Sequence, residues 1–170
     1  MDRIIVIIAL ALSIAACSRG NTVATATLQP KSGTQVTGDA TFTQKGDKVE
    51  IVVNAKSLPP GAHGIHVHEK GDCSAADASS AGAHFAPGGG QHAGPTDPGR
   101  HGGDLGNIDA DASGAGKLTI TTDKLSVGSG EKDVIGKALV IHGDPDDLKT
   151  QPSGNSGGRI ACGVIEVKTN

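Results

Sequence analysis

Six of the seven histidines in this chain belong to one pattern, and that pattern constrains the fold more than any other feature of the sequence. Five of them and an aspartate lie within residues 64–104, and the sixth follows an apolar run far downstream. Imidazole is the commonest transition-metal ligand, and a histidine cluster that ends in a carboxylate suits copper or zinc better than magnesium or calcium. We therefore predict a two-metal site that the fold must assemble from His66, His68, His84, His92, His101, Asp104 and His142.

The rest of the chain has the pattern of a β protein. Short runs of alternating apolar and polar residues recur about every ten residues, separated by Gly, Pro and Asp turns, which indicates an all-β sandwich or barrel. With two Phe and neither Trp nor Tyr, the core must consist of small aliphatic side chains. The predicted strands span residues 23–28, 36–43, 48–53, 63–68, 107–112, 117–121, 138–142 and 159–167.

Two loops interrupt this pattern. Residues 71–103 show no secondary-structure signal, and a loop of this length inside a compact domain is usually functional or disordered. A second loop, 143–158, contains Asp146 and Asp147. Because side chains alternate faces along a strand, His66 and His68 must point the same way, with Val67 packed behind them.

The ligands divide by the kind of segment that carries them. Strands or strand ends carry His66, His68 and His142. The long loop and its end carry His92, His101 and Asp104. Four imidazoles around one ion suit copper, and three imidazoles with a carboxylate suit a closed zinc site. Seven residues fill eight coordination positions only if one histidine serves both ions, and His84 is the natural bridge.

The N-terminal residues have the pattern of an export signal. The apolar run 4–16 is too short to span a bilayer comfortably but is normal for a signal peptide. Residues Ile14–Cys17 resemble a bacterial lipobox, so we expect a signal peptide at 1–16, a tether at 17–22 lipidated at Cys17, and one domain at 23–170. The alternative is an ordinary secretory signal with an incidental cysteine.

Cysteine usage and charge define the compartment and the partners. Cys73 and Cys162 can pair in an oxidising compartment, and a lipid thioether would account for the remaining Cys17. We expect a periplasmic, membrane-anchored lipoprotein whose only membrane contact is this anchor. The formal net charge of -3 and the absence of a basic run argue against a nucleic-acid partner.

Several motifs together resemble one enzyme family. They are Gly64–Glu69, Gly82–Pro87, His92–Pro95, Arg100–Asn107, Val140–His142 and Gly154–Ile165. These motifs are highly specific, and the resemblance covers almost everything after residue 22. By them the chain resembles the copper/zinc superoxide dismutases of the bacterial secreted type.

The resemblance implies an eight-stranded antiparallel Greek-key β-sandwich or barrel that dismutates superoxide to dioxygen and hydrogen peroxide. It places copper at His66, His68, His84 and His142, and zinc at His84, His92, His101 and Asp104. It also implies a Cys73–Cys162 disulfide, and an Arg159 that draws in the superoxide anion. Asp146 would link a copper histidine to a zinc histidine, here His66 and His92.

Two departures from the family qualify these expectations. The loop after His142 is shorter than in the animal enzymes and lacks their substrate-steering charges, so steering must rest mainly on Arg159 and the metals or use other charges. The bacterial dimers tend to use aromatic residues at the interface, and this chain has almost none, so we expect a monomer rather than a homodimer.

His63 fits no ligand position, and we expect it to have a structural hydrogen-bonding role.

Two rival functions remain on the same fold. A non-enzymatic copper-binding or copper-delivery lipoprotein would need an exchangeable site, often with Met or Cys ligands for Cu(I), and the only Met is the initiator. It would not need Arg159 or a complete zinc set. A structural domain that uses zinc alone would not need His66, His68 and His142 together.

Overall fold

The structure, a computed structural model, describes residues 22–169 of the chain. The predicted signal peptide and the predicted lipidation site at Cys17 lie outside the described residues. Eight strands account for most of the regular structure: β1 (Val23–Pro30), β2 (Thr37–Lys45), β3 (Lys48–Lys56), β4 (Gly61–His68), β5 (Asp104–Ala110), β6 (Gly116–Thr122), β7 (Ala138–His142) and β8 (Arg159–Val167).

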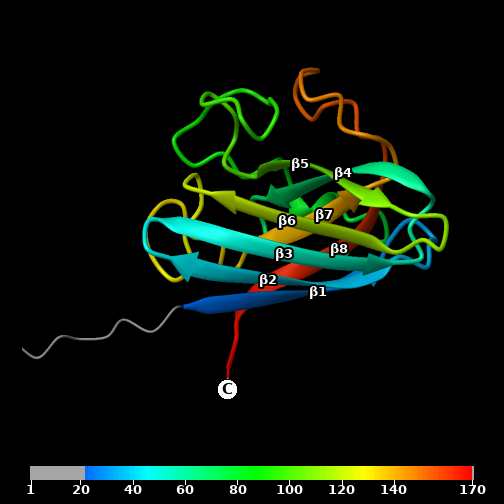
Figure 1. The fold of residues 1–170 in the computed structure, drawn as a ribbon, viewed down its shortest axis with the longest axis horizontal. Coiled ribbons are helices and arrows are strands. Elements are labelled where there is room, and N and C mark those ends of the chain that lie inside the picture. The colour runs from blue at the N-terminus through cyan, green and yellow to red at the C-terminus, as the bar shows by residue number, and fades with distance from the viewer. Residues whose placement is uncertain (1–21, 170) are drawn as a thin grey trace, which may run out of the picture.

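These strands form a closed antiparallel barrel in the order β1-β2-β3-β6-β5-β4-β7-β8 (Figure 1). The chain therefore crosses from β3 to β4 without pairing them, and β6 fills the place next to β3. This arrangement confirms the predicted eight-stranded, all-β Greek-key architecture.

Alternation of small apolar residues builds the interior of the barrel. In β3, Val49, Ile51 and Val53 are fully buried, while the residues between them are partly exposed. Ala40 and Phe42 of β2 occupy the matching positions across the ladder, paired with Val53 and Ile51. This burial of every second residue follows the alternation of apolar and polar residues in the sequence.

One seam of the barrel is short. β3 and β6 pair over seven residue pairs, but β5 and β6 pair only through Asp109–Lys117 and Ala110–Gly116. Beyond these two pairs, the start of β5 and the end of β6 part from each other. Here Arg100 of the long loop donates to Thr122 at the end of β6.

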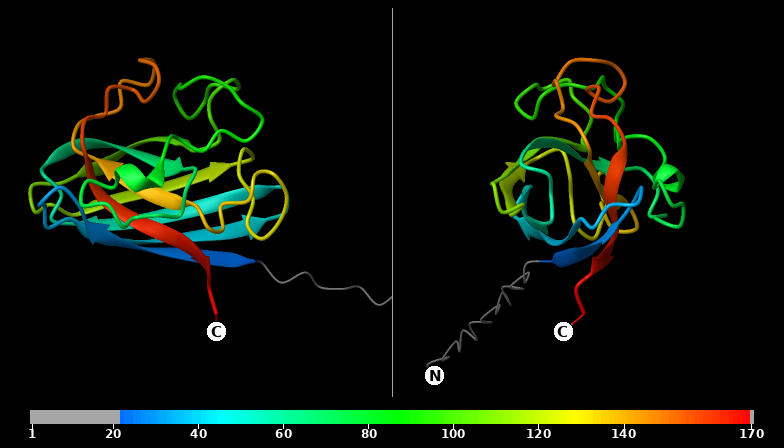
Figure 2. Two further views of the ribbon diagram at one scale, coloured as in Figure 1. Left: turned by 180° about the vertical axis from the view of Figure 1, so that it is seen from behind. Right: turned by 90° about the vertical axis from the view of Figure 1, so that its right-hand side faces the viewer.

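Both predicted loops extend from the same side of the barrel in Figures 1 and 2, the long one in green and the later one in orange. The long loop was expected to lack secondary structure, but it contains one 3-10 turn, Ser79–Ala81. The Cys73–Cys162 disulfide ties the start of this loop to β8, as predicted. Within residues 22–169, no helix has the length and apolar character needed to cross a membrane.

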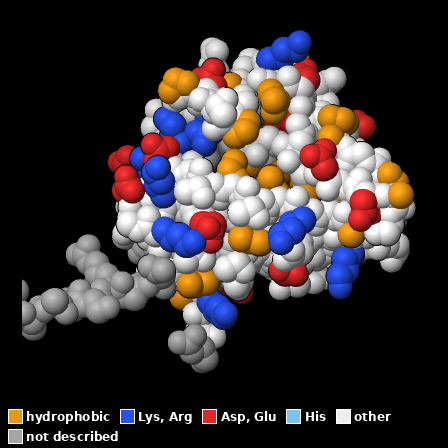
Figure 3. All heavy atoms as spheres, viewed as in Figure 1, with side chains coloured by type: hydrophobic (Ala, Val, Ile, Leu, Met, Phe, Trp, Pro, Cys, Tyr) orange, Lys and Arg blue, Asp and Glu red, His pale blue; other side chains and the backbone are white. Residues whose placement is uncertain are grey.

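Acidic and basic side chains are interspersed on the face shown in Figure 3, and histidine side chains are not visible there. Most of the predicted metal ligands are buried, and His101 is partly buried. His66 and His68 are fully buried, and His84, His92 and His142 are nearly so.

Candidate metal centre

β4 supplies two histidines on one face. Ile65 and Val67 point into the apolar core, so the alternating His66 and His68 point away from it and towards the loops. His68 Nδ1 lies 3.0 Å from the carbonyl oxygen of Gly82. Because a carbonyl only accepts, this nitrogen carries the proton and leaves Nε2 with a free lone pair.

Three further rings are each held through one nitrogen, by a carbonyl or a carboxylate oxygen. His142, at the end of β7, directs Nδ1 to the Gly157 carbonyl at 3.3 Å. His84, in the long loop, places Nδ1 2.8 Å from Asp104 Oδ1. His66 uses Nε2, which lies 2.9 Å from Asp146 Oδ2. Each of the four rings thus has one partnered nitrogen and one remaining nitrogen.

The four remaining nitrogens share a single unusual property. They are buried, have no hydrogen-bond partner among the described residues, and are His66 Nδ1, His68 Nε2, His84 Nε2 and His142 Nε2. Ligand atoms of these four residues lie within 4.8 Å of one another. Buried polar atoms without partners are costly and rare, so four converging ones have the character of a cation site. This donor set fits a copper ion.

The protonation of these rings agrees with metal binding. Burial lowers the pKa of His68 to about 2 and the pKa of His142 to about 4. Burial, together with the neighbouring His84, also lowers the pKa of His66 well below its ordinary value. His66, His68 and His142 are therefore neutral at pH 7, and a neutral imidazole is the form that binds a metal.

A second group surrounds Asp104. Its Oδ1 lies 2.8, 3.1 and 3.3 Å from the Nδ1 atoms of His84, His92 and His101. Ligands at the corners of a tetrahedral zinc site are separated by about 3.3–3.4 Å, given metal–ligand distances near 2.0–2.1 Å. Ligand atoms of His84, His92 and Asp104 also lie within 4.8 Å of one another, as a shared zinc ion requires, whereas His101 is attached to this set by its 3.3 Å contact with Asp104.

Backbone groups orient the Asp104 carboxylate. The N–H groups of Ala93 and His101 donate to Oδ2 at 3.2 and 3.1 Å, which leaves Oδ1 for the group centre. Burial alone would raise the pKa of Asp104, but the hydrogen bond from His84 and the charges of His84 and His92 outweigh it and lower the pKa to about 2. Asp104 was predicted to lie in the loop before a strand starting at 107; it is instead the first residue of β5.

His84 belongs to both groups, with Nδ1 in the second and Nε2 in the first. His66 also lies within 4.8 Å of three members of the second group. We assign His66 to the first group, since its Nε2 is occupied by Asp146 and only its Nδ1 is free. His84 is therefore placed where the sequence expectation put a bridging ring.

Asp146 is a second connection between the two groups, besides His84. Its Oδ2 accepts from His66 Nε2 and its Oδ1 from His92 Nε2, both at 2.9 Å. The side chain of Asn107 holds the Asp146 backbone through hydrogen bonds of 2.7 and 3.0 Å. Any side chain at Gly154 would collide with the Asp146 carboxylate, so this loop needs glycine there.

Comparison with known proteins agrees with this geometry. The sequence model of the family described as copper/zinc superoxide dismutase (SODC) matches residues 36–165. The chain belongs to the copper/zinc superoxide dismutase family. Among solved structures, it is similar to one titled "Crystal Structure Analysis of the clock protein EA4", with 39% identity, a TM-score of 0.79, and coverage of 87% of this chain and 96% of that chain. A member of this fold can thus carry a description other than that of an enzyme.

Arg159 lies beside the first group. It opens β8 and is paired in register with His142. Its Nη1 and Nη2 donate to the carbonyls of Ala78 and Gly82 at 2.7 and 2.6 Å. Its charge is close enough to contribute to the lowered pKa of His68 and His142. Gly82 therefore orients a candidate copper ligand and the guanidinium through one carbonyl oxygen.

Sequence reasoning missed two positioning residues, Asn107 and Gln151. Gln151 links the two loops: its Oε1 accepts from the His92 N–H at 2.9 Å, and its Nε2 donates to the His92 carbonyl at 2.7 Å. Asn107 was visible only as part of the family motif. Nothing in the local pattern around Gln151 indicates a partner 59 residues away.

His63 lies outside both groups. Its ring nitrogens are 3.0 and 2.8 Å from the carbonyls of His142 and Pro59, which gives it a structural place at the start of β4.

Proposed function

We propose that this protein dismutates superoxide: two superoxide anions and two protons give dioxygen and hydrogen peroxide. Copper would be held by His66, His68, His84 and His142, and zinc by His84, His92, His101 and Asp104. The observation that carries the proposal is the convergence of four buried ring nitrogens without partners. Family membership supports the same assignment.

When bound, copper supplies one-electron chemistry between Cu(II) and Cu(I), and zinc supplies a fixed, redox-silent charge. The chain's own residues set the conditions. Strands β4 and β7 hold three rings rigidly, so little reorganisation accompanies electron transfer. His84 can carry a proton on Nε2 whenever that nitrogen is free, which places a proton donor beside the reacting oxygen atoms.

Arg159 would bring the substrate to this position. Superoxide carries one negative charge, and a guanidinium attracts it and can donate hydrogen bonds to it. Two carbonyls fix the guanidinium, yet they use only two of its five N–H donors. The remaining donors are available to an anion.

The decisive experiment is superoxide decay measured by pulse radiolysis on the full chain loaded with copper and zinc. We expect rapid decay for the wild type, a loss of at least about tenfold for Arg159→Ala, and partial recovery for Arg159→Lys, which restores the charge. A metal-loaded wild type no faster than buffer would reject the enzymatic function.

The rival function, copper binding or delivery without catalysis, has weaker support. Exchange with a partner needs accessible ligands, and the four rings are buried. Both cysteines among the described residues are joined in the disulfide, so neither offers a thiolate for Cu(I).

We also propose that the protein is a periplasmic lipoprotein anchored through Cys17. The Cys73–Cys162 disulfide supports an oxidising compartment. Replacing Cys17 by Ser should release the protein from the membrane fraction, whereas Asn21→Ser, in the same tether, should not. Retention of the Cys17→Ser variant would contradict the anchor.

A further inference from the structure

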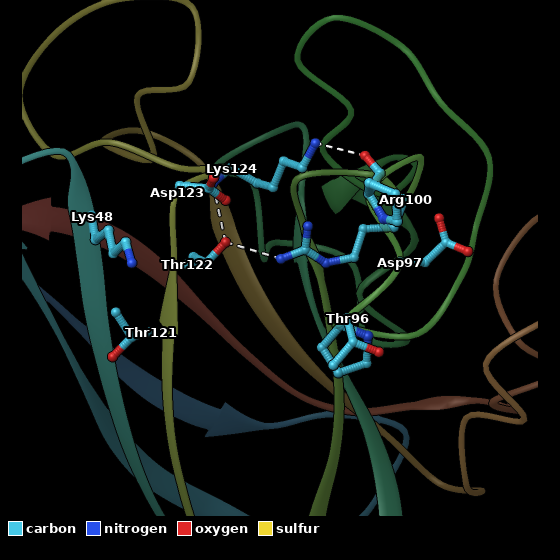
Figure 4. A pocket seen from close by; sticks show the side chains of 10 residues that line it. Lys48, Thr96, Asp97, Arg100, Thr121, Thr122, Asp123 and Lys124 are labelled. Atoms are coloured by element: carbon cyan, nitrogen blue, oxygen red, sulfur yellow. Dashed lines mark hydrogen bonds between the residues drawn. The ribbon is translucent and has the colours of Figure 1, made fainter.

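A cavity lies at the short seam of the barrel, away from the two histidine groups. It occupies about 350 Å³ where β5 and β6 part, and the end of β6 and the long loop line it (Figure 4). Neither the metal centre nor the proposed reaction uses its side chains. Three of the side chains that line it are cationic: Lys48, Arg100 and Lys124.

Arg100 is the unusual member of this set. It is only 6% exposed, and its Nη2 donates to Thr122 Oγ1 at 2.9 Å. Its Nε is sealed from solvent and has no acceptor among the described residues. No carboxylate within residues 22–169 lies within ion-pair distance of the guanidinium, whose only side-chain partner is a neutral hydroxyl.

This arrangement leaves part of the cost of burying the guanidinium uncompensated. A guanidinium remains charged at any ordinary pH, and burial disfavours the charge of Arg100 by more than its three neighbouring carboxylates, all beyond ion-pair distance, offset: Asp104, Asp123 and Asp97. The fold nevertheless keeps this charge beside an open cavity instead of packing it against a carboxylate. Its Nη1 makes no hydrogen bond to the described residues and is not sealed as Nε is, so a small acceptor in the cavity can reach it.

The other charges favour an anion in the cavity. Lys124 extends over it to the Pro98 carbonyl, and Lys48 approaches from β3 (Figure 4). Two carboxylates, Asp97 and Asp123, also line the wall, so the cationic side chains exceed the anionic ones by one. Asp97 already accepts the N–H of Gly99 at 2.7 Å, and in Figure 4 it lies on the opposite side of Arg100 from the guanidinium.

We propose that this cavity binds a small tetrahedral oxyanion of the phosphate class, held by Arg100 with Lys124 as the second cation. A phosphate supplies several acceptors for the unpaired guanidinium donors and a counter-charge for the buried arginine. This site is independent of the proposed dismutase activity, since none of the metal ligands lines the cavity.

Phosphate titration of the metal-loaded full chain tests the proposal. At constant ionic strength, saturating phosphate should raise the Tm by about 2–5 °C, while equivalent chloride should not. In the zinc-loaded chain, amide resonances of Thr122 and Lys124 and the Nε–H resonance of Arg100 should shift. A phosphate effect no larger than that of chloride would overturn the proposal, as would shifts centred on Arg159.

Variants give an independent test. Thr122→Asp places a carboxylate next to the guanidinium, so it should fold, be at least as stable as the wild type, and lose the phosphate response. Lys124→Gln should weaken binding several-fold, and Lys117→Gln, which changes an exposed lysine of β6 that does not line the cavity, should leave it unchanged. Phosphate binding by Thr122→Asp with wild-type affinity would refute the site. Arg100 itself precedes the ligand His101, so these variants carry the test if Arg100→Gln does not fold.

Discussion

The two halves of the metal centre are built in different ways. The strand-borne half takes His66, His68 and His142 from β4 and β7, whose antiparallel register fixes their spacing whether or not a metal is bound. The loop-borne half takes His92 and His101 from a segment with one short helical turn, and gathers them around the Asp104 carboxylate. His84 and Asp146 join the halves.

The difference is also electrostatic. Burial keeps the strand-borne rings neutral, whereas the loop-borne half contains a buried negative charge that attracts a dication. A rigid neutral site suits an ion that changes its charge during turnover. An anionic site built from a loop suits one that binds once and orders its surroundings. Four predictions test this contrast.

The largest effect should come from the disulfide, which orders the loop without any metal. Replacing Cys73 and Cys162 together by Ala removes a cross-link between residues 89 positions apart. We expect a loss of about 4–5 kcal/mol in the free energy of unfolding, measured by urea denaturation under oxidising conditions. The wild type unfolded in the same urea series with excess reductant, which opens the disulfide, is the matched control. A loss below about 1 kcal/mol would mean that the metals alone order the loop.

The two halves should respond to acid at different pH. His68 and His142 have folded pKa values of about 2 and about 4, below their ordinary value of 6.5, so the unfolded chain binds more protons between these values. The contribution of these two neutral rings to the stability of the metal-free protein is therefore fully present above pH 6.5 and falls as the pH drops below that value. We expect about 2 kcal/mol lost per ring between pH 7 and pH 5.

The Asp104 carboxylate should act only at lower pH. Its pKa is lowered from 3.8 to about 2, so its contribution is present above pH 3.8 and is lost below that value. Urea denaturation of metal-free protein at a series of pH values measures both ranges. A stability that stays flat between pH 7 and pH 5 would show that the strand-borne rings are not held neutral by burial.

Breaking the link between the halves should have a moderate effect. In Asp146→Asn, one oxygen becomes an NH2 group that cannot accept from His66 or His92. We expect zinc affinity to fall about 10–100-fold, measured by competition with a chromogenic chelator. Asp147→Asn is the control, because that carboxylate contacts only its own loop, through Lys149 and Thr150. Equal affinities in the two variants would argue against coupling through Asp146.

The smallest effect should come from the contact between the loops. Gln151→Ala removes two hydrogen bonds to the His92 backbone, at a cost of about 1–2 kcal/mol in the stability of the zinc-loaded protein. Gln91→Ala, whose exposed side chain makes no hydrogen bond to the described residues, should be neutral. If both variants unfold at the same temperature, the Gln151 contact does not stabilise the loop-borne half.

What could be predicted from the sequence follows the same division. Period-two alternation predicted β3 and the shared direction of His66 and His68, because these depend on local backbone geometry. The barrel closure, the contact from Gln151 to His92, and the carbonyls that hold Arg159 could not be predicted in this way. Each depends on segments that meet only after folding. The beginning of β5 was misplaced by three residues because the Asp104–Gly106 segment has a glycine-rich loop composition.

The short β5–β6 seam has a consequence for the metal-free protein. A closed barrel avoids pairing with other chains because it leaves no strand edge open. Here the loop that carries Arg100 and the proposed zinc ligands contacts the poorly paired end of β6. If that loop lifts when zinc is scarce, the uncovered backbone of β6 becomes a template for another copy. We expect self-association of the metal-starved protein to begin at this seam, so that metal supply also governs solubility.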